Sequence, residues 1–336
     1  MNNKKICIVG GAGFIGHNIA LTLSQSDYEI LIIDSLAINN YHSLHSDNIP
    51  NPKLSKLILD ERMNSLKSQP NIKILYHDAR DYHLLSNTIS NFQPKVLIQL
   101  AAVSHANRSN KDPYSTFDNS LRTLENALDA CKGFIEHFIY FSSSMVYGNF
   151  QSSKVDEDSN CDPIGIYGAL KLAGEIIVKS YGSVFNLPYT IVRPSALYGE
   201  RCVSRRVGQI FIESALTNKP IIIKGDGSEE LDFTYIEDLV QGIKQIIENE
   251  NSKNQTFNLT YGKSNSVINL LNTLKKHFDN LEVEFHDQEP FTPKRGTLDV
   301  SKANKLINYN PEYPIEIAYP KYIEWYKKIW EIYKKS

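Results

Sequence analysis

The sequence has few cysteines, a net charge close to zero and no long hydrophobic run. Its 336 residues contain four cysteines, which are Cys7, Cys131, Cys161 and Cys202. None of them forms a CxxC pair, which argues against a zinc site or a disulfide framework. We therefore expect no bound metal, and we expect reduced thiols in a cytoplasmic protein.

The charge balance and the short apolar runs exclude further classes of protein. The formal net charge is −2, so the chain has no basic surplus that would attract nucleic acid or an anionic membrane. The apolar run after Lys5 soon meets glycines and is too short for a signal peptide, and no later run is long enough to cross a bilayer. We expect neither a nucleic-acid nor a membrane partner.

Short apolar runs alternate with helical patterns through the first half of the chain. Apolar runs of this length bounded by turn residues predict buried strands. The predicted strands are 6–9, 30–33, 72–75, 96–100, 138–141 and 190–192, and the clearest helical stretches between them are 18–25 and 120–131. Strands and helices in alternation predict an α/β fold with a Rossmann-type, doubly wound parallel sheet.

The alternation weakens after about residue 195, which divides the chain into two predicted parts. Residues 1–185 form the sheet domain, and residues 195–336 form a smaller C-terminal α/β lobe that binds substrate. The strand near 189–194 and the segment near 232–248 return to the first domain. Residues 39–71 exceed a minimal βαβ unit, and we interpret them as an inserted loop and helix that elaborate the surface.

The first predicted strand runs into the sequence GGAGFIG at residues 10–16. A dinucleotide pyrophosphate needs backbone N–H groups with no side chain in the way, and the N-terminus of the next helix adds a positive dipole. This glycine pattern follows a strand and opens a helix, which is the context that indicates dinucleotide binding. The residues predicted to contact the cofactor here are Gly10, Gly13, Phe14 and Ile15.

Asp34 ends the second predicted strand, 18 residues after Gly16. A carboxylate at this spacing accepts hydrogen bonds from the adenosine ribose and repels a 2′-phosphate. No Arg or Lys follows until Lys53, so the predicted cofactor is NAD rather than NADP. Asp78 and Ala79 follow the third strand, where a carboxylate can bond the adenine amino group. A loop aspartate without a ligand fits the same position.

Tyr167 and Lys171 form a YxxxK pair in a predicted helix. Residues four apart share a helix face, so the ammonium would stabilise a phenolate and lower the tyrosine pKa, as a general base requires. Ser143 follows a buried strand, so its hydroxyl emerges where ligands of α/β proteins bind and can bond the oxygen that Tyr167 deprotonates. A surface Tyr and Lys, and serines that simply form a turn, are the alternative interpretation.

Together these residues resemble the extended short-chain dehydrogenase/reductases, the NAD-dependent epimerase/dehydratase family of nucleotide-sugar enzymes. The matching segments, in order, are 10–16, 100–102, 113–123, 143–148, 167–171, 193–199, 225–238 and 295–303. The resemblance implies that Ser143 is catalytic, that Tyr167 is the base and that Lys171 binds the nicotinamide ribose. It also implies a homodimer and further cofactor contacts, which are Leu100, Ala101, Ala102, Asn119, Tyr167 and Lys171.

The family's shared first step implies oxidation at a ring carbon, usually C4, of a sugar carried on a nucleotide diphosphate. Related 4,6-dehydratases place Asp-Glu after the catalytic residue, where this chain has Ser144 and Met145. This departure disfavours dehydration and also uronate decarboxylation. We expect a 4-epimerase, with a C4 dehydrogenase that releases a 4-keto sugar as the alternative. A silent NAD-binding scaffold is the non-enzymatic alternative, although such proteins usually lack the tyrosine or the lysine.

The residues expected to hold the nucleotide sugar depart from the family pattern. Ala196 stands where an Asn is common, and Leu231 stands where an Arg is common. The basic loop at 201–207 resembles a segment of GDP-mannose 4,6-dehydratases, and guanidinium groups bind diphosphates bidentately. We therefore expect a GDP-sugar in preference to a UDP-sugar, although a solvated basic face fits the loop as well. The predicted substrate contacts are Ser144, Arg205, Arg206 and Arg295.

Overall fold

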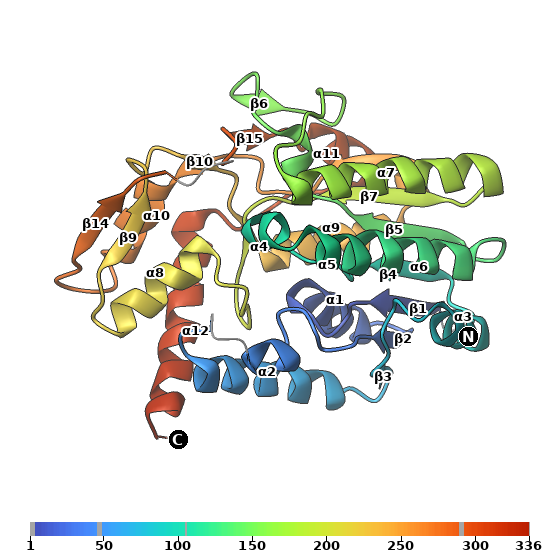
Figure 1. The fold of residues 1–336 in the computed structure, drawn as a ribbon, viewed down its shortest axis with the longest axis horizontal. Coiled ribbons are helices and arrows are strands. Elements are labelled where there is room, and N and C mark those ends of the chain that lie inside the picture. The colour runs from blue at the N-terminus through green and yellow to red at the C-terminus, as the bar shows by residue number, and fades with distance from the viewer. Residues whose placement is uncertain (1–3, 46–48, 105, 289–291, 336) are drawn as a thin grey trace.

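Seven parallel strands form the central sheet of the protein (Figure 1). The computed structural model describes residues 4–45, 49–104, 106–288 and 292–335. The strands lie in the order β12-β7-β5-β4-β1-β2-β3. Their bounds are β1 (Lys4–Val9), β2 (Tyr28–Ile33), β3 (Ile72–Leu75), β4 (Val96–Gln99), β5 (His137–Phe141), β7 (Tyr189–Arg193) and β12 (Gln255–Asn258). The predicted parallel α/β sheet is thus confirmed, and β12 is an addition to it.

Both faces of the sheet are covered, which explains why its central strands are largely apolar. Successive side chains of a strand point to opposite faces. In β1, Ile6 and Ile8 enter one hydrophobic core, whereas Cys7 and Val9 enter the other. All four side chains are fully buried. A sheet with one solvent-exposed face would instead have polar residues at every second position of its strands.

Helices on the two faces supply the rest of these two cores. On one face lie α1 (Phe14–Ser24), α2 (Pro52–Lys67), α9 (Ile236–Glu248) and α12 (Ile315–Lys335). On the other lie α3 (Tyr82–Phe92), α6 (Thr123–Cys131) and α7 (Ile166–Phe185), with the short helices α4 (Ala106–Lys111) and α5 (Pro113–Phe117) beside α7. The two-sided arrangement is the one that the alternating pattern predicts.

The inserted segment 39–71 contains α2, and the expectation of a surface elaboration is wrong. One side of α2 is buried, and the helix packs against α1 and against α12 near the end of the chain. Figure 1 shows α2 and α12 side by side. The insertion is therefore part of the core on that face of the sheet. Its buried row includes an arginine, Arg62, which is 1% exposed.

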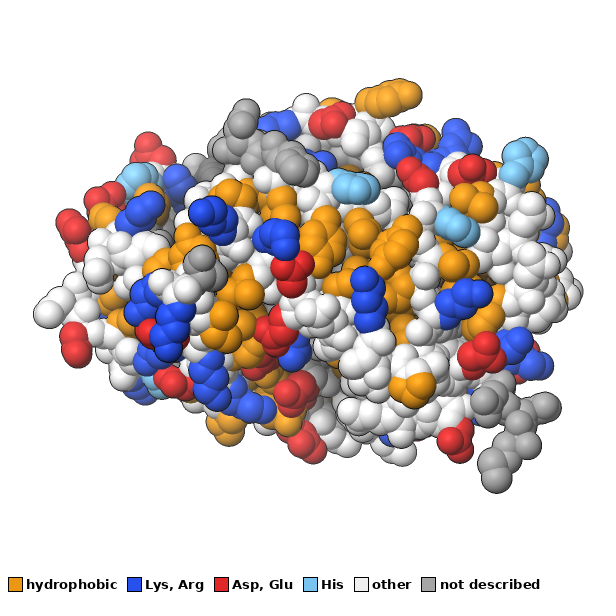
Figure 2. All heavy atoms as spheres, turned by 90° about the horizontal axis from the view of Figure 1, so that it is seen from below, with side chains coloured by type: hydrophobic (Ala, Val, Ile, Leu, Met, Phe, Trp, Pro, Cys, Tyr) orange, Lys and Arg blue, Asp and Glu red, His pale blue; other side chains and the backbone are white. Residues whose placement is uncertain are grey.

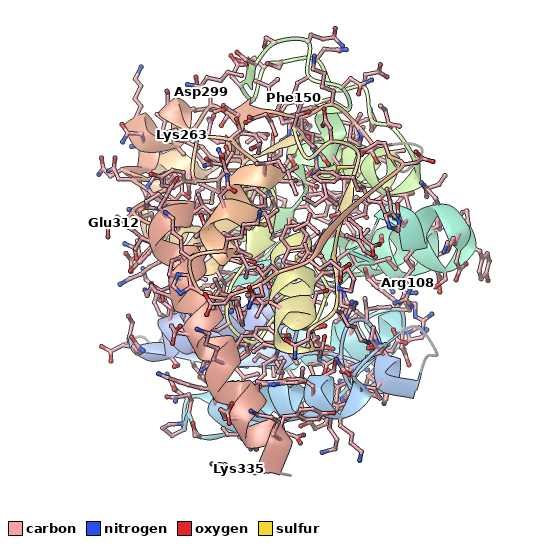
Figure 3. The ribbon with its side chains drawn as sticks, turned by 90° about the vertical axis from the view of Figure 1, so that its left-hand side faces the viewer. Arg108, Phe150, Lys263, Asp299, Glu312 and Lys335 are labelled. Atoms are coloured by element: carbon pink, nitrogen blue, oxygen red, sulfur yellow. The ribbon has the colours of Figure 1, made fainter. Side chains whose placement is uncertain are left out.

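A smaller group of elements lies beyond the carboxyl ends of the strands (Figure 1). It contains α8 (Val207–Leu216), β9 (Ile221–Lys224), α10 (Val267–Leu274) and β14 (Val283–His286). Strands β9 and β14 pair in parallel, and α12 packs on α8 and α10. In Figure 3, α12 runs from the side of Glu312 down to Lys335, while Arg108 of α4 lies on the opposite side.

Short strand pairs and one further helix complete the described structure. The pairs are β6 (Lys154–Val155) with β15 (Thr297–Leu298), β8 (Leu197–Tyr198) with β11 (Thr234–Tyr235), and β10 (Glu230–Leu231) with β13 (Asn265–Ser266). The helix is α11 (Ser301–Ile307). Phe150 and Asp299, near the first pair, lie at the end of the molecule opposite Lys335 (Figure 3).

The surface carries charges of both signs. On the face in Figure 2, Lys and Arg side chains are interspersed with Asp and Glu around a stretch of hydrophobic side chains. Within the described residues, no helix combines the length and the apolar character needed to span a bilayer.

Candidate active site

Two adjoining cavities open where the parallel strands end. The first is lined by residues that follow β1, β2, β3 and β4, and the second by residues that follow β4, β5 and β7, with the start of α7. Ligands of doubly wound α/β proteins bind at this edge of the sheet. The residues that line both cavities are Ile15, Leu100, Ala102, Ser104, Leu197 and Arg206. Because the two cavities share these residues, a ligand in the first cavity would lie next to a ligand in the second.

The glycine turn leaves room for a diphosphate at the mouth of the first cavity. Gly10 has φ +83°, and a Cβ there would lie 2.6 Å from the backbone nitrogen of Ala101. A Cβ on Gly16 would lie 2.5 Å from the Cα of Gly11, so α1 packs closely on the turn. Gly13 caps α1 without a side chain, which leaves the first N–H groups of the helix open to an anion. These residues fit NAD. Gly10, Gly13, Phe14 and Ile15 all line this cavity.

Asp34 also lines the first cavity, and its carboxylate supports the glycine turn. Its Oδ2 accepts from the Ala12 N–H at 2.9 Å, and its Oδ1 accepts from the Leu36 N–H at 2.8 Å. Burial raises the pKa of Asp34, while these two hydrogen bonds act in the opposite direction. The structure thus places the predicted ribose acceptor beside the turn that would bind the diphosphate.

The other predicted cofactor contacts divide between the two cavities. Asp78, Ala79, Ala101 and Asn119 line the first cavity, and Leu100 and Ala102 line both. Asp78 forms an ion pair with Arg80 at 2.6 Å, so part of its charge is already compensated. The Asn119 amide donates to the Ser115 carbonyl at 2.8 Å. Tyr167 and Lys171 line the second cavity only.

Ser143, Tyr167 and Lys171 come together in the second cavity. Ser143 follows β5 and Tyr167 lies in the first turn of α7, and both residues line this cavity. The Lys171 Nζ lies 6.0 Å from the centre of the Tyr167 ring and donates to the Phe141 carbonyl at 2.6 Å. The YxxxK spacing therefore places both side chains on the helix face that meets the end of β5. Ser144 lines the same cavity.

Burial and nearby groups shift the pKa of both Tyr167 and Lys171. Burial raises the pKa of Tyr167, whereas Arg206 and the hydrogen bond with Ser143 act to lower it. Burial also lowers the pKa of Lys171 to about 8, against the attraction of Glu175. A further cation beside the phenol would favour the phenolate.

The three predicted substrate arginines have different surroundings. Arg206 lines both cavities and donates to the Ser104 carbonyl at 2.8 Å. Arg295 lines the second cavity and pairs with Glu229 at 2.8 Å. Arg205 lines neither cavity, and its guanidinium pairs with Glu213 of α8 at 2.6 Å. The structure therefore brings Arg206 and Arg295 to the site and leaves Arg205 outside it.

Arg62 is a cavity residue that the sequence prediction missed. It lines the first cavity beside Asp34, although it belongs to the inserted helix α2. A signal for it exists in the sequence, because Arg62 continues the four-residue spacing of Leu54 and Ile58. An arginine in a row of apolar residues on one helix face is a charge that the fold buries.

We predict that Asp34→Asn weakens NAD binding about tenfold or more, since it removes one charged acceptor worth about 1.5–3 kcal/mol. The preference for NAD over NADP should shrink at the same time, because the repulsion of a 2′-phosphate is lost. Equilibrium titration with both cofactors measures each effect. Asp27→Asn, at the exposed amino end of the same strand, is the matched control. Equal affinities in the Asp34 variant and the control would contradict the prediction.

Comparisons with known proteins agree with this geometry. The model of the NAD dependent epimerase/dehydratase family matches residues 6–260. A putative UDP-glucose 4-epimerase of Methanocaldococcus jannaschii is 29% identical over 332 residues, covering 96% of this chain and 98% of that protein. A crystal structure of UDP-glucuronic acid 4-epimerase from Bacillus cereus, in complex with UDP-glucuronic acid and NAD, matches with a TM-score of 0.87 at 27% identity. It covers 97% of this chain and 99% of that chain.

A third relative is longer than this chain. It is a trifunctional UDP-glucose 4,6-dehydratase/UDP-4-keto-6-deoxy-D-glucose 3,5-epimerase/UDP-4-keto-L-rhamnose-reductase of Arabidopsis thaliana. It is 27% identical over 318 residues, which are 90% of this chain and 44% of that protein. The predicted family, the predicted cofactor NAD and the predicted enzymatic nature are confirmed. This chain belongs to the NAD-dependent epimerase/dehydratase family of nucleotide-sugar enzymes.

Proposed function

We propose that this enzyme is a UDP-sugar 4-epimerase. The observation that carries the proposal is that Tyr167 and Ser143 line one cavity, which adjoins the cofactor cavity. A sugar hydroxyl between these two side chains lies within reach of a base and a hydrogen-bond donor. Relatives named as UDP-glucose and UDP-glucuronic acid 4-epimerases support the same reaction.

In this proposal Tyr167 removes the proton from the C4 hydroxyl of the sugar and returns it in the second half of the reaction. NAD held by Gly10, Gly13 and Asp34 would supply the hydride acceptor and a positive charge that favours the phenolate. Ser143 donates a hydrogen bond to the same sugar oxygen and holds it in place. Lys171, whose Nζ lies 6.0 Å from the centre of the Tyr167 ring, adds positive charge near the phenol. The sugar turns over between the two half-reactions and would take the hydride back at C4 on its other face, so the C4 configuration is inverted without net oxidation.

The lining of the second cavity favours epimerisation over dehydration. Elimination of the C6 hydroxyl needs an acid and a base next to C5 and C6. Among the described residues that line this cavity, none is Asp or Glu, and Ser144 and Met145 occupy the positions after Ser143. The neutral pair Ser144 and Met145 suits a reaction that consists of proton and hydride transfer at one carbon.

The nucleotide in this proposal is UDP rather than GDP. The preference for GDP came from the basic loop, yet Arg205 of that loop pairs with Glu213 outside both cavities. The relatives described above are named for UDP-sugars. Arg206 and Arg295 remain as the cations that would meet a diphosphate or a sugar carboxylate in the second cavity.

The test is to supply the purified enzyme and NAD with UDP-glucose, UDP-glucuronic acid and GDP-mannose in separate reactions. We expect the C4 epimer of one of the UDP-sugars, resolved by NMR, with no lasting gain in NADH absorbance. Accumulation of NADH with a 4-keto sugar would show a dehydrogenase instead. Turnover of GDP-mannose alone would contradict the choice of nucleotide. Tyr167→Phe serves as the control for catalysis by this site.

A further inference from the structure

Arg62 lies in a buried row on the inner face of α2. Leu54, Ile58, Arg62 and Leu66 follow one another at four-residue intervals, and each is at most 1% exposed. Burying a guanidinium is costly unless strong partners replace the lost water. Within the described part of the chain, no carboxylate oxygen lies within ion-pair distance of Arg62. Its hydrogen bonds go to two backbone carbonyl groups instead.

The first of these carbonyls belongs to the glycine turn of the cofactor cavity. The Arg62 Nη1 donates to the Ala12 carbonyl at 3.2 Å, and the buried Asn40 donates to the same oxygen at 3.1 Å. The Ala12 N–H is bound by Asp34 at 2.9 Å. The peptide groups on both sides of Ala12 are therefore fixed, and two of their three partners, Asn40 and Arg62, come from the inserted segment.

The second carbonyl belongs to Arg201, in the loop of residues 199–206 between β8 and α8. The Arg62 Nη2 donates to this carbonyl. The neighbouring Glu61 accepts from the Arg201 Nε at 3.0 Å. Two successive residues of α2 thus hold the backbone and the side chain of Arg201. Figure 1 shows the chain that enters α8 descending toward α2.

The loop 199–206 reaches the wall that the two cavities share. Ser204 lines the cofactor cavity, and Arg206 lines both cavities. Arg201 has φ +64° and Arg205 has φ +51°, which are unfavourable backbone angles for residues other than glycine. Such backbone persists only where surrounding contacts impose it. The contacts from α2 are the ones that impose it at Arg201.

We propose that Arg62 is a positioning residue that couples NAD binding to nucleotide-sugar binding. Cofactor that fixes the glycine turn fixes the Ala12 carbonyl, and through Arg62 it fixes the Arg201 carbonyl and the loop 199–206. The second ligand then binds to a loop that is already ordered, so its binding does not include the free-energy cost of ordering that loop. Each ligand therefore increases the affinity for the other. This coupling rests on the proposed function in one respect, which is that the second ligand is a nucleotide diphosphate. It does not require that the enzyme turns the sugar over.

The test compares Arg62→Met with wild-type enzyme freed of any bound cofactor. The dissociation constant of NAD is measured with and without saturating UDP. If only GDP binds, GDP replaces UDP, so an error in the proposed nucleotide is distinguished from an absence of coupling. In wild type we expect the diphosphate to tighten NAD binding about fivefold or more, and NAD to tighten diphosphate binding by the same factor. In the Met variant both factors should fall to about one while each ligand still binds.

Limited trypsin digestion supplies a readout that a loss of stability alone would not give. The loop contains three cleavage sites, after Arg201, Arg205 and Arg206. We expect NAD to protect these sites in wild type and in Lys56→Met, an exposed control on the same helix. NAD should leave them unprotected in Arg62→Met. If that variant does not fold, Arg62→Lys is used instead. It keeps the charge but offers a single donor nitrogen, so it should show reduced coupling. Full coupling and full protection in the folded variant, or no coupling in wild type, would overturn the proposal.

Discussion

Tyr167→Phe is expected to lower the turnover number by about 10²- to 10⁴-fold, the usual contribution of a general acid or base. The substitution removes one oxygen atom and leaves the ring in place, so the packing of α7 against the end of β5 is kept. The loss falls on turnover because Tyr167 lines the second cavity, apart from the residues of the cofactor cavity. Steady-state kinetics with the accepted sugar and a separate NAD titration measure the two effects.

Tyr181→Phe is the matched control for this variant. Tyr181 lies on the same helix, where its ring contacts Phe185 far from either cavity. It should leave both turnover and NAD affinity unchanged. If Tyr167→Phe kept wild-type turnover, the chemistry would have to be assigned to another group. If it lost NAD binding together with turnover, Tyr167 would be part of the cofactor site rather than the base.

Arg193→Met is expected to destabilise the fold by about 3–5 kcal/mol, because it leaves a buried carboxylate without its counter-ion. Arg193 ends β7 and contacts Glu175 of α7 through two nitrogens, at 2.9 and 2.7 Å, with both side chains at most 4% exposed. It also donates to the Tyr147 hydroxyl at 2.9 Å. The same Glu175 accepts from the hydroxyl of Ser142, next to Ser143, at 2.5 Å. Chemical denaturation measures the loss.

Two variants isolate the cause of that loss. Arg193→Met combined with Glu175→Met removes both charges, and it should recover most of the lost stability because no unpaired ion remains. Lys334→Met breaks an exposed pair with Glu331 and should change stability by less than about 1 kcal/mol. A double variant as unstable as the single one would show that packing or the bonds to Ser142 and Tyr147 matter more than the charge.

The sheet could be predicted from the sequence because its strands are buried on both faces. Runs such as Ile30–Ile33 are apolar at every position, and their spacing leaves room for one helix between neighbours. Strand β12 escaped prediction because its residues, Gln255–Asn258, include three polar side chains. Its pairing with β7 is a contact across about sixty residues, and no local pattern reports it. Tertiary position overrides local pattern at such an edge.

Most of the residues proposed for the cofactor and for catalysis stand out in the sequence because they follow a strand or lie near the start of a helix at a fixed spacing. The structure gathers them into two adjoining cavities. The basic loop shows the limit of that reasoning, because the sequence cannot say which way an arginine points. Arg205 and Arg206 are adjacent, yet one turns to Glu213 and the other to the cavities. Arg62 escaped prediction because it belongs to the inserted helix α2 and lies 16 residues before Asp78, the next predicted cofactor residue along the chain.

The parallel sheet is completed by chain that is synthesised late. Its strands β7 and β12 come from residues beyond 185, and α12, which covers α2, spans Ile315–Lys335. A fragment that ends at residue 185 would leave β5 as an unpaired edge strand and would leave the buried Glu175 without its ion-pair partner Arg193. Residues 1–185 by themselves therefore lack two strands of the sheet that carries the two cavities. Helix α2, which carries Arg62, acquires its covering helix only once residues 315–335 have been synthesised.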